Sequence, residues 1–174
     1  MLFEYCPKCK GPLKEELFEG NEKHQVCQDC RFVFYQNSKP TAAALIINDL
    51  GQILLLKRAI SPSCGKWDMM GGFLKNGEKP IDGLAREAKE ELGIDINSSE
   101  FFGIYLDRYQ NDQVDIFTFN VYYLIMLSDQ TITLSEENSE YKWFDENNIP
   151  WKILAFNQNR EVLEDYFRNT KMGP

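Results

Sequence analysis

The sequence predicts an α/β fold with a mixed sheet, preceded by a small cysteine-bearing module. Apolar, strand-like runs stand on both sides of one central amphipathic helix, a second helix closes the chain, and two Cys-x2-Cys pairs lie near its start. Strands and helices in this order are typical of layered α/β domains. The 174 residues suffice for one main domain and a small extra module. We therefore expect modules at residues 1–36 and 38–174, joined near Pro40.

The front module is defined by its cysteines. The pairs Cys6–Cys9 and Cys27–Cys30 are separated by seventeen residues, a spacing typical of a structural zinc site with four thiolates. A segment of this length buries little core, so Zn²⁺ would supply much of its folding free energy. Two disulfides are the alternative, which the lack of an apolar secretion signal before Cys6 disfavours.

The main module is expected to contain strands around one helix and to end in another helix. Buried strands tolerate continuous apolar runs, whereas polar clusters with Gly, Asn or Asp indicate turns. The expected strands are 41–47, 52–57, 100–106, 114–127 and 141–144, with a polar loop at 107–113 and the last helix at 158–168.

The central helix carries the most informative pattern. Pro80 suits a first helical position and Gly93 suits the residue after the last turn. Between them Glu87, Glu90 and Glu91 stand at i, i+3 and i+4, which places three carboxylates on one face. A different face, able to pack on a sheet, consists of Ile81, Leu84, Ala88 and Leu92.

Three carboxylates on one helix face repel one another unless a cation lies among them. Hard oxygen ligands suit Mg²⁺ or Mn²⁺. A solvated acidic face is the alternative for the glutamates alone. The register of Gly72, Glu78, Arg86 and Gly93 with the glutamates disfavours that alternative, and Arg86 lies four residues before Glu90, within reach of its carboxylate.

From Gly72 to Gly93 the intervals read G-x5-E-x7-R-E-x-x-E-E-x-G, which is the Nudix box. The chain resembles the Nudix hydrolase superfamily over roughly 39–171. With the segment KRAISPSCGKWDMMGGFLKNGE and the cysteine pairs, it is similar to zinc-ribbon members of the NADH pyrophosphatase and ADP-ribose/FAD pyrophosphatase type. The resemblance implies an α/β/α sandwich and cleavage of the diphosphate in a nucleoside diphosphate linked to another group.

The resemblance also implies residue roles. Glu87, Glu90 and Glu91 would hold magnesium or manganese with the carbonyl of Gly71, while the paired residues Arg86 and Glu78 would brace the helix. An acidic residue of the box or of a later loop would accept a proton. The loop candidates are Glu136, Glu137 and Glu140.

The substrate stays open among ADP-ribose, FAD, NADH and similar compounds. The motif SQPWPFPQS, typical of NADH pyrophosphatases, is absent, and the corresponding region reads LDRYQNDQVDIF. The alternative to an enzyme is a catalytically weak Nudix-fold sensor that binds a nucleotide or a regulatory partner.

Charge and hydropathy limit the other partners. The net charge of -8 argues against nonspecific nucleic-acid binding, which needs a basic footprint. The longest apolar run, 116–127, is too short for a membrane-spanning helix of about 20 residues. We expect a cytoplasmic protein whose partner is a small nucleotide. A homodimer contact through the ribbon stays an open alternative.

Overall fold

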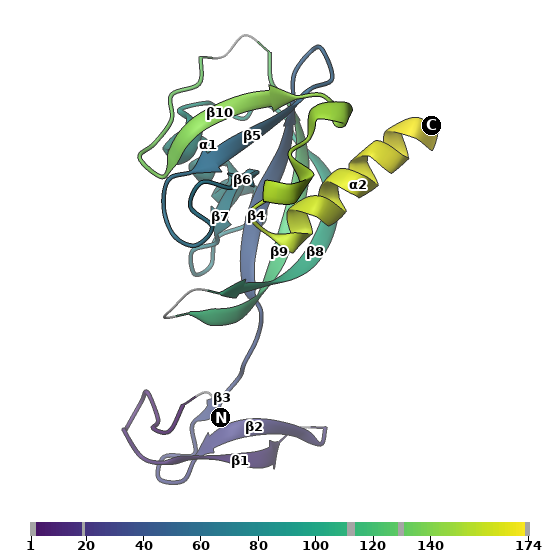
Figure 1. Cartoon of the computed structure of the whole chain (residues 1–174). Coiled ribbons are helices and arrows are strands. Elements are labelled where there is room, and N and C mark those ends of the chain that lie inside the picture. The colour runs from purple at the N-terminus through teal and green to yellow at the C-terminus, as the bar shows by residue number, and fades with distance from the viewer. Residues whose placement is uncertain (1–2, 19, 111–113, 129–130, 173–174) are drawn as a thin grey trace. The chain divides into compact units, whose positions relative to one another are not determined.

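The computed structural model describes residues 3–18, 20–110, 114–128 and 131–172 (Figure 1). The chain divides into two compact units, residues 1–37 and 38–174. Within the described ranges, no helix is long and apolar enough to cross a membrane.

The first unit is a three-stranded antiparallel sheet. Its strands are β1 (Leu13–Phe18), β2 (Glu22–Cys27) and β3 (Val33–Phe34), in the spatial order β1-β2-β3. Among its described residues, the buried hydrophobic cluster consists of Cys6, Leu13 and Cys27, with Cys30 and Phe32 packed against it. So small a core agrees with a fold that depends on its cysteine site.

The second unit is built on one large mixed sheet. Its strands are β4 (Lys39–Ile47), β5 (Ile53–Arg58), β6 (Trp67–Asp68), β7 (Met70–Phe73), β8 (Glu100–Gln110), β9 (Asp115–Met126) and β10 (Asn138–Phe144). The main order is β10-β5-β4-β9-β8, with β6 beside β5 and β7 beside β4. Strands β4 and β9 run parallel and the other pairs run antiparallel.

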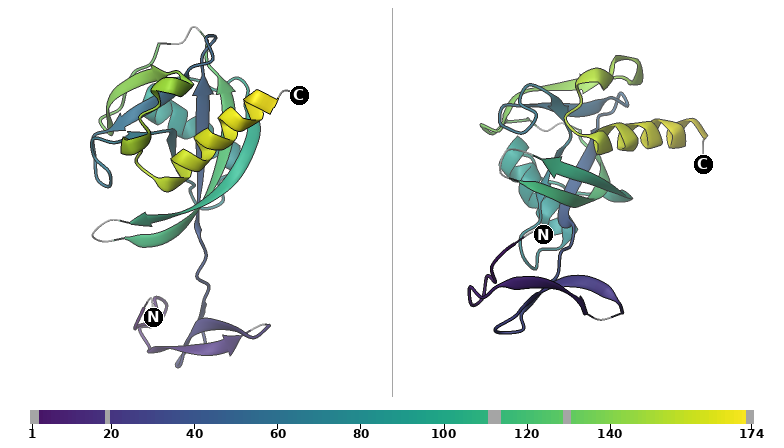
Figure 2. Two further views of the ribbon diagram at one scale, coloured as in Figure 1. Left: turned by 45° about the vertical axis from the view of Figure 1, so that its right-hand side comes forward. Right: turned by 60° about the horizontal axis from the view of Figure 1, so that its bottom comes forward.

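Helices cover both faces of this sheet (Figures 1 and 2). Along β4, Ala42, Ala44 and Ile46 pack in the cluster with helix α1 (Pro80–Leu92), whereas Ala43 and Leu45 pack in the cluster with helix α2 (Asn157–Met172). A strand buried on both faces needs apolar residues at every position, which explains the unbroken run AAALII. The predicted α/β/α sandwich with a mixed sheet is confirmed.

Helix α1 has the bounds that the sequence predicts. Pro80 occupies its first turn, and Gly93 ends it in the left-handed region at φ 68°. The predicted apolar face is right for Leu84, Ala88 and Leu92, which are fully buried, but wrong for Ile81, which is 38% exposed. The buried residue of the first turn is instead Gly83, which lies against Leu74 and Glu78.

The prediction of a polar loop at 107–113 is wrong for residues 107–110, which belong to a strand. Strand β8 continues through Gln110, which pairs with Asp115 of β9. The polar residues belong to a long hairpin in which Arg108 forms an ion pair with Asp115. Residues 111–113 lie outside the described part of the chain. Strand β10 and helix α2 also begin earlier than predicted, at Asn138 and Asn157.

Candidate functional site

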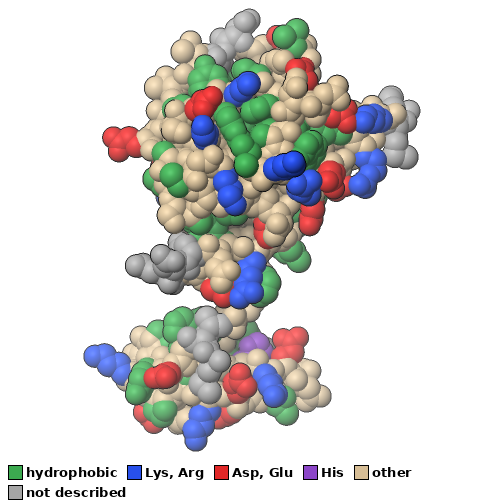
Figure 3. All heavy atoms as spheres, in the orientation of Figure 1, with side chains coloured by type: hydrophobic (Ala, Val, Ile, Leu, Met, Phe, Trp, Pro, Cys, Tyr) green, Lys and Arg blue, Asp and Glu red, His purple; other side chains and the backbone are tan. Residues whose placement is uncertain are grey.

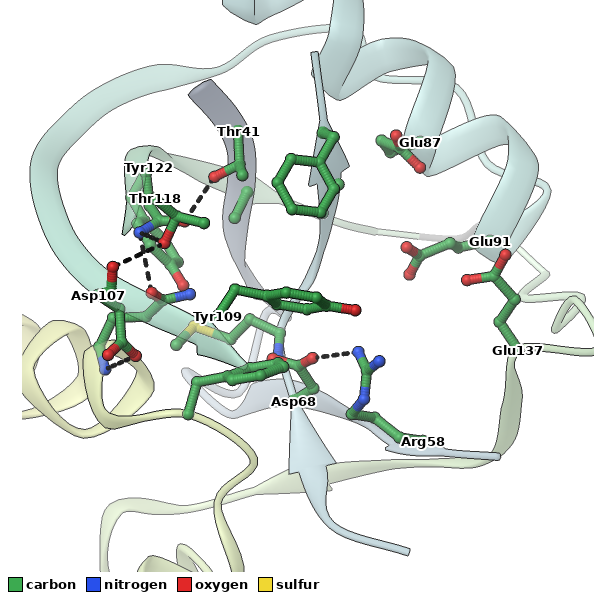
Figure 4. A pocket seen from close by; sticks show the side chains of 18 of the residues that line it. Thr41, Arg58, Asp68, Glu87, Glu91, Asp107, Tyr109, Thr118, Tyr122 and Glu137 are labelled. Carbon is green, nitrogen blue, oxygen red and sulfur yellow. Dashed lines mark hydrogen bonds and ion pairs between the residues drawn. The ribbon is translucent and has the colours of Figure 1, made fainter. Parts of the chain in front are cut away.

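A cavity of about 390 Å³ lies beside the acidic face of α1 (Figure 4). Strands β4, β5, β7, β8 and β9, helix α1 and the loop before β10 each contribute to its wall. The carboxylates that line it are Asp68, Glu87, Glu90, Glu91, Asp107 and Glu137, and the cationic residues are Arg58 and Arg108. The structure thus brings all three glutamates of the predicted set to one cavity.

Two glycines of β7 form the wall between the sheet and α1. Gly71 has φ 153°, and a Cβ there would lie 2.6 Å from the Ala43 Cα. A Cβ on Gly72 would collide with the Glu87 carboxylate. At Gly71 only glycine leaves room for the close approach of β7 to β4, whereas a Cβ on Gly72 would meet the flexible end of the Glu87 side chain. Gly71 lines the cavity, as it must if its carbonyl oxygen is to be a ligand of the predicted metal ion.

Arg86 is the hub of the hydrogen bonds around the acidic face. Its Nε and Nη2 donate to the two oxygens of Glu78 at 2.8 and 2.9 Å. Its Nη1 donates to Glu87 at 2.6 Å and to Glu90 at 3.0 Å, and Nη2 also reaches the Phe73 carbonyl at 3.1 Å. Arg86 thereby links the loop before α1, the helix itself and the end of β7.

The electrostatics of the cavity favour a cation. Burial raises the pKa of Glu91 well above its usual range, and the negative charges of Asp68, Glu87 and Glu137 raise it further. Burial also raises the pKa of Glu87, although Arg86 opposes this effect. A divalent cation would stabilise the ionised carboxylates, and oxygen donors are the ligands that Mg²⁺ and Mn²⁺ prefer.

The three glutamates differ in how they are held. Arg86 engages the carboxylates of Glu87 and Glu90, whereas Glu91 accepts a 3.4 Å hydrogen bond from Asn138. Among the described residues, the close grouping of metal-ligating atoms is found for cysteines and not for these glutamates. Because Arg86 occupies two of the carboxylates, a cation would have to share them with its guanidinium.

Of the three loop candidates for a proton acceptor, only Glu137 lines the cavity. Figure 4 shows its carboxylate beside that of Glu91. Glu140 forms an ion pair with Lys57 at 3.3 Å on the exposed side of β10, and Glu136 is exposed and does not line the cavity. Of these three glutamates, Glu137 is thus the one with access to the cavity.

Several polar residues in and around the cavity were not predicted from the sequence. Arg58 donates from Nη1 to Asp68 at 2.8 Å, and Asn159 donates to the other oxygen of Asp68 at 2.8 Å. Asn120, buried in β9, accepts a 2.6 Å hydrogen bond from Thr41. A polar residue inside an apolar strand, such as Asn120 in IFTFNVYYLIML, was the available signal.

The ribbon unit holds a second potential metal site. The sulfur atoms of Cys6, Cys9, Cys27 and Cys30 all lie within 4.8 Å of one another. The Cys9–Cys27 and Cys6–Cys30 sulfurs are 3.4 and 3.8 Å apart. These separations are near the edge of a ZnS₄ tetrahedron, about 3.8 Å for bonds of about 2.3 Å, and far above the disulfide bond length of about 2.05 Å. All four are free cysteines, so the disulfide alternative is wrong.

The knuckle geometry agrees with a zinc ribbon. The residues after the second cysteine of each pair, Lys10 and Arg31, have φ 65° and 59°. Their backbone N–H groups donate to the Cys6 and Cys27 carbonyls at 2.9 and 3.1 Å. Both knuckles thus turn through the left-handed region, where glycine is favoured.

Comparisons with known proteins agree with this geometry. The NUDIX domain profile matches residues 37–166. The NAD-capped RNA hydrolase NudC of Vibrio atlanticus is 27% identical over 92% of this chain, which spans only 56% of that relative's length. The ADP-ribose pyrophosphatase of Methanocaldococcus jannaschii is 28% identical over 71% of this chain and 70% of its own length.

Solved structures show the same fold. The crystal structure of a NUDIX hydrolase from Nitrosomonas europaea superimposes with a TM-score of 0.73 and 27% identity, covering 98% of this chain and 94% of that one. The NUDIX domain of Shewanella oneidensis NrtR, solved with ADP ribose, matches with a TM-score of 0.63 at 19% identity over 77% of this chain and 90% of its own. The profile covers well over half of the chain and falls on the unit that holds the box glutamates, so this chain belongs to the NUDIX domain family.

Proposed function

We propose that this protein is a metal-dependent hydrolase that cleaves the diphosphate of a nucleoside diphosphate linked to another group. The observation that carries the proposal is the cavity into which α1 directs Glu87, Glu90 and Glu91. The products would be a nucleoside monophosphate and a phosphorylated second group. ADP-ribose, FAD and NADH are the substrate candidates.

Magnesium or manganese would be held by Glu87, Glu90 and Glu91, with the Gly71 carbonyl beside them. The cation would polarise the diphosphate, neutralise charge and lower the pKa of an attacking water. The hydrogen bonds of Arg86 to Glu78 fix the guanidinium, which in turn orients the Glu87 and Glu90 carboxylates.

Glu137 is the proposed proton acceptor. It lines the cavity from the loop before β10 and adds to the negative charge that raises the pKa of Glu91. A general base must lie within hydrogen-bond reach of the attacking water. Of the three loop glutamates, only Glu137 lines the cavity in which such a water would lie.

In the ribbon, Cys6, Cys9, Cys27 and Cys30 would hold a structural zinc ion. Four protein ligands leave no open coordination position, so the ion would stabilise the unit without taking part in the reaction. We place this soluble enzyme in the cytoplasm, where structural cysteines remain reduced.

NAD-capped RNA is a second candidate substrate, because the NudC relatives carry that name and one of them matches 92% of this chain. The net charge of -8 weighs against it, since RNA binding is favoured by a basic surface. On the face shown in Figure 3, Lys and Arg side chains are interspersed with Asp and Glu.

A substrate panel tests the proposal. ADP-ribose, FAD, NADH and a short NAD-capped RNA are each incubated with protein and Mg²⁺ or Mn²⁺, and the products are identified by mass. AMP with ribose phosphate, AMP with FMN, AMP with NMNH, or a 5′-monophosphate RNA would assign the substrate. Tight nucleotide binding without turnover of any compound would favour the sensor alternative.

A further inference from the structure

Arg58 is the more enclosed of the two arginines that line a mainly acidic cavity, among the residues that the structure describes. Of the described residues, six carboxylates and two arginines line this cavity. The Arg108 side chain is 56% exposed and forms an ion pair with Asp115, whereas the Arg58 side chain is only 18% exposed. Arg58 is therefore placed to meet an anion that enters the cavity.

The Arg58 guanidinium is held on three sides. Its Nε donates to the Pro62 carbonyl at 2.8 Å, and its Nη1 donates to Asp68 at 2.8 Å. The guanidinium carbon lies 5.2 Å from the centre of the Phe156 ring, a distance typical of cation–π contacts. Within the described part of the chain, no hydrogen bond is found from Nη2. A fixed guanidinium with unused donors is well suited to a phosphate.

A buried chain of hydrogen bonds fixes Asp68 in turn. One carboxylate oxygen accepts from Asn159 at 2.8 Å and from the Met69 backbone at 2.9 Å, while the other accepts from Arg58. Asn159 is completely buried, and its own oxygen accepts from the Tyr122 hydroxyl at 3.3 Å. These contacts connect α2 and β9 to the cavity through side chains that neither bind the proposed cation nor hold α1.

We infer that Arg58 binds the substrate phosphate that the proposed cation does not neutralise, and that Asp68 is its positioning residue. The inference rests on the proposed function and extends it to the residues that recognise the diphosphate. In Figure 4 the Arg58 guanidinium lies between Asp68 and the carboxylates of Glu91 and Glu137. A diphosphate in the cavity would therefore have positive charge on two sides: the metal ion proposed to bind at α1 and the Arg58 guanidinium at the end of β5.

The test uses two probes on the full-length protein, Mn²⁺ alone and α,β-methylene-ADP in the presence of Mn²⁺. Hydrogen bonds to charged groups contribute enough that Arg58→Ala is expected to weaken binding of the nucleotide about 10- to 100-fold. Affinity for Mn²⁺ alone should change much less than affinity for the nucleotide. Arg58 acts on the proposed ligand Glu91 through its charge, but its hydrogen bonds go to Pro62 and Asp68 rather than to a proposed ligand. Arg58→Lys, which keeps one charge without the planar fork, should give a smaller loss.

A double-mutant cycle tests the positioning role. Asp68→Asn should weaken nucleotide binding less than Arg58→Ala does, and the double variant should bind as weakly as Arg58→Ala alone, because Asp68 acts through Arg58. The control is Arg160→Ala, which removes an arginine that is 48% exposed on α2.

Two results would overturn the inference: nucleotide affinity within twofold of wild type in a folded Arg58→Ala protein, or equal losses for Mn²⁺ and nucleotide. Failure of the proposed function is read separately, as a lack of turnover by the wild-type protein. If nucleotide binding depends on Arg58 but the wild-type protein turns over no substrate, the phosphate-binding role of Arg58 is supported and the proposed hydrolase activity is rejected.

Discussion

Arg86 and Glu78 form a two-point pair in which Nε and Nη2 of the guanidinium donate to the two carboxylate oxygens at 2.8 and 2.9 Å. The pair joins the loop before α1 to the helix. Because two bonds fix the plane of the guanidinium, its Nη1 points at Glu87 and Glu90 rather than rotating freely. The orientation of both carboxylates therefore depends on a residue outside the acidic helix face.

This pair predicts a pH-dependent contribution to stability. Hydrogen bonds from Arg86 lower the pKa of Glu78 from 4.5 to about 2. A lowered carboxyl pKa stabilises the fold above pH 4.5, and that stabilisation is lost as the pH falls toward 2. The difference in melting temperature between wild type and Glu78→Gln should therefore be larger at pH 6 than at pH 3. Glu164→Gln, at an exposed position on α2, is the control: its melting temperature should stay close to that of wild type at both pH values. A melting-temperature difference between wild type and Glu78→Gln that is the same at pH 6 and pH 3 would contradict this prediction.

The raised pKa of Glu91 predicts the pH dependence of metal binding. Burial and neighbouring carboxylates favour its protonated form, and a cation requires the ionised form. Affinity for Mn²⁺ should therefore rise as the pH increases toward the pKa of Glu91, and binding should release a proton. Calorimetric titration in buffers of different ionisation enthalpy measures that proton. In Glu91→Gln the binding should be weak and its pH dependence reduced; proton release equal to wild type would show that another group titrates.

Gly72→Ala should damage the site more than the fold. The added Cβ would collide with the Glu87 carboxylate and displace it. We expect turnover to fall at least tenfold, since small displacements of catalytic groups carry losses of this order. Gly77→Ala is the control, because its Cβ meets no atom within 4 Å although φ is 77°. That variant should lose about 1–2 kcal/mol of stability and keep its activity. Full activity in Gly72→Ala would show that Glu87 needs no fixed position.

The cysteine cluster predicts one zinc ion per chain. Cys6→Ser should abolish stoichiometric zinc, measured by mass spectrometry under native conditions, and should unfold the ribbon unit, because its buried cluster is so small. Cys64→Ser is the matched control, since the Cys64 thiol is exposed and hydrogen-bonded to the Ala59 carbonyl, outside the cluster. Retained zinc in Cys6→Ser would rule out the four-thiolate site.

Local signals were enough to predict the helix and its acidic face. Pro80 and Gly93 mark the ends of α1 by their own backbone preferences, and helical periodicity places Glu87, Glu90 and Glu91 together. These features need no knowledge of distant contacts, which is why their prediction matches the structure.

Features that depend on contacts between distant segments could not be predicted. The hydrogen bond between Asp68 and Asn159 joins residues 91 positions apart. The extension of β8 through Asp107 and Arg108 depends on pairing with β9, whereas the local sequence, rich in polar residues, indicates a loop. Likewise, Ile81 is 38% exposed, and the buried residue of the first helical turn is Gly83, beside Leu74 of a different segment. Local sequence gives no information on these partners.

The most direct test of the account is the metal-dependent turnover of Glu90→Gln and Glu91→Gln beside that of Glu164→Gln. Each change removes one carboxylate charge and keeps the shape of the side chain, and circular dichroism checks the fold. With the best substrate of the panel, both α1 variants should lose at least a hundredfold in kcat while Glu164→Gln keeps wild-type turnover, since each loses an oxygen charge proposed to hold the cation. Wild-type turnover in a folded Glu90→Gln or Glu91→Gln protein would contradict the assignment of the α1 glutamates as the catalytic metal site.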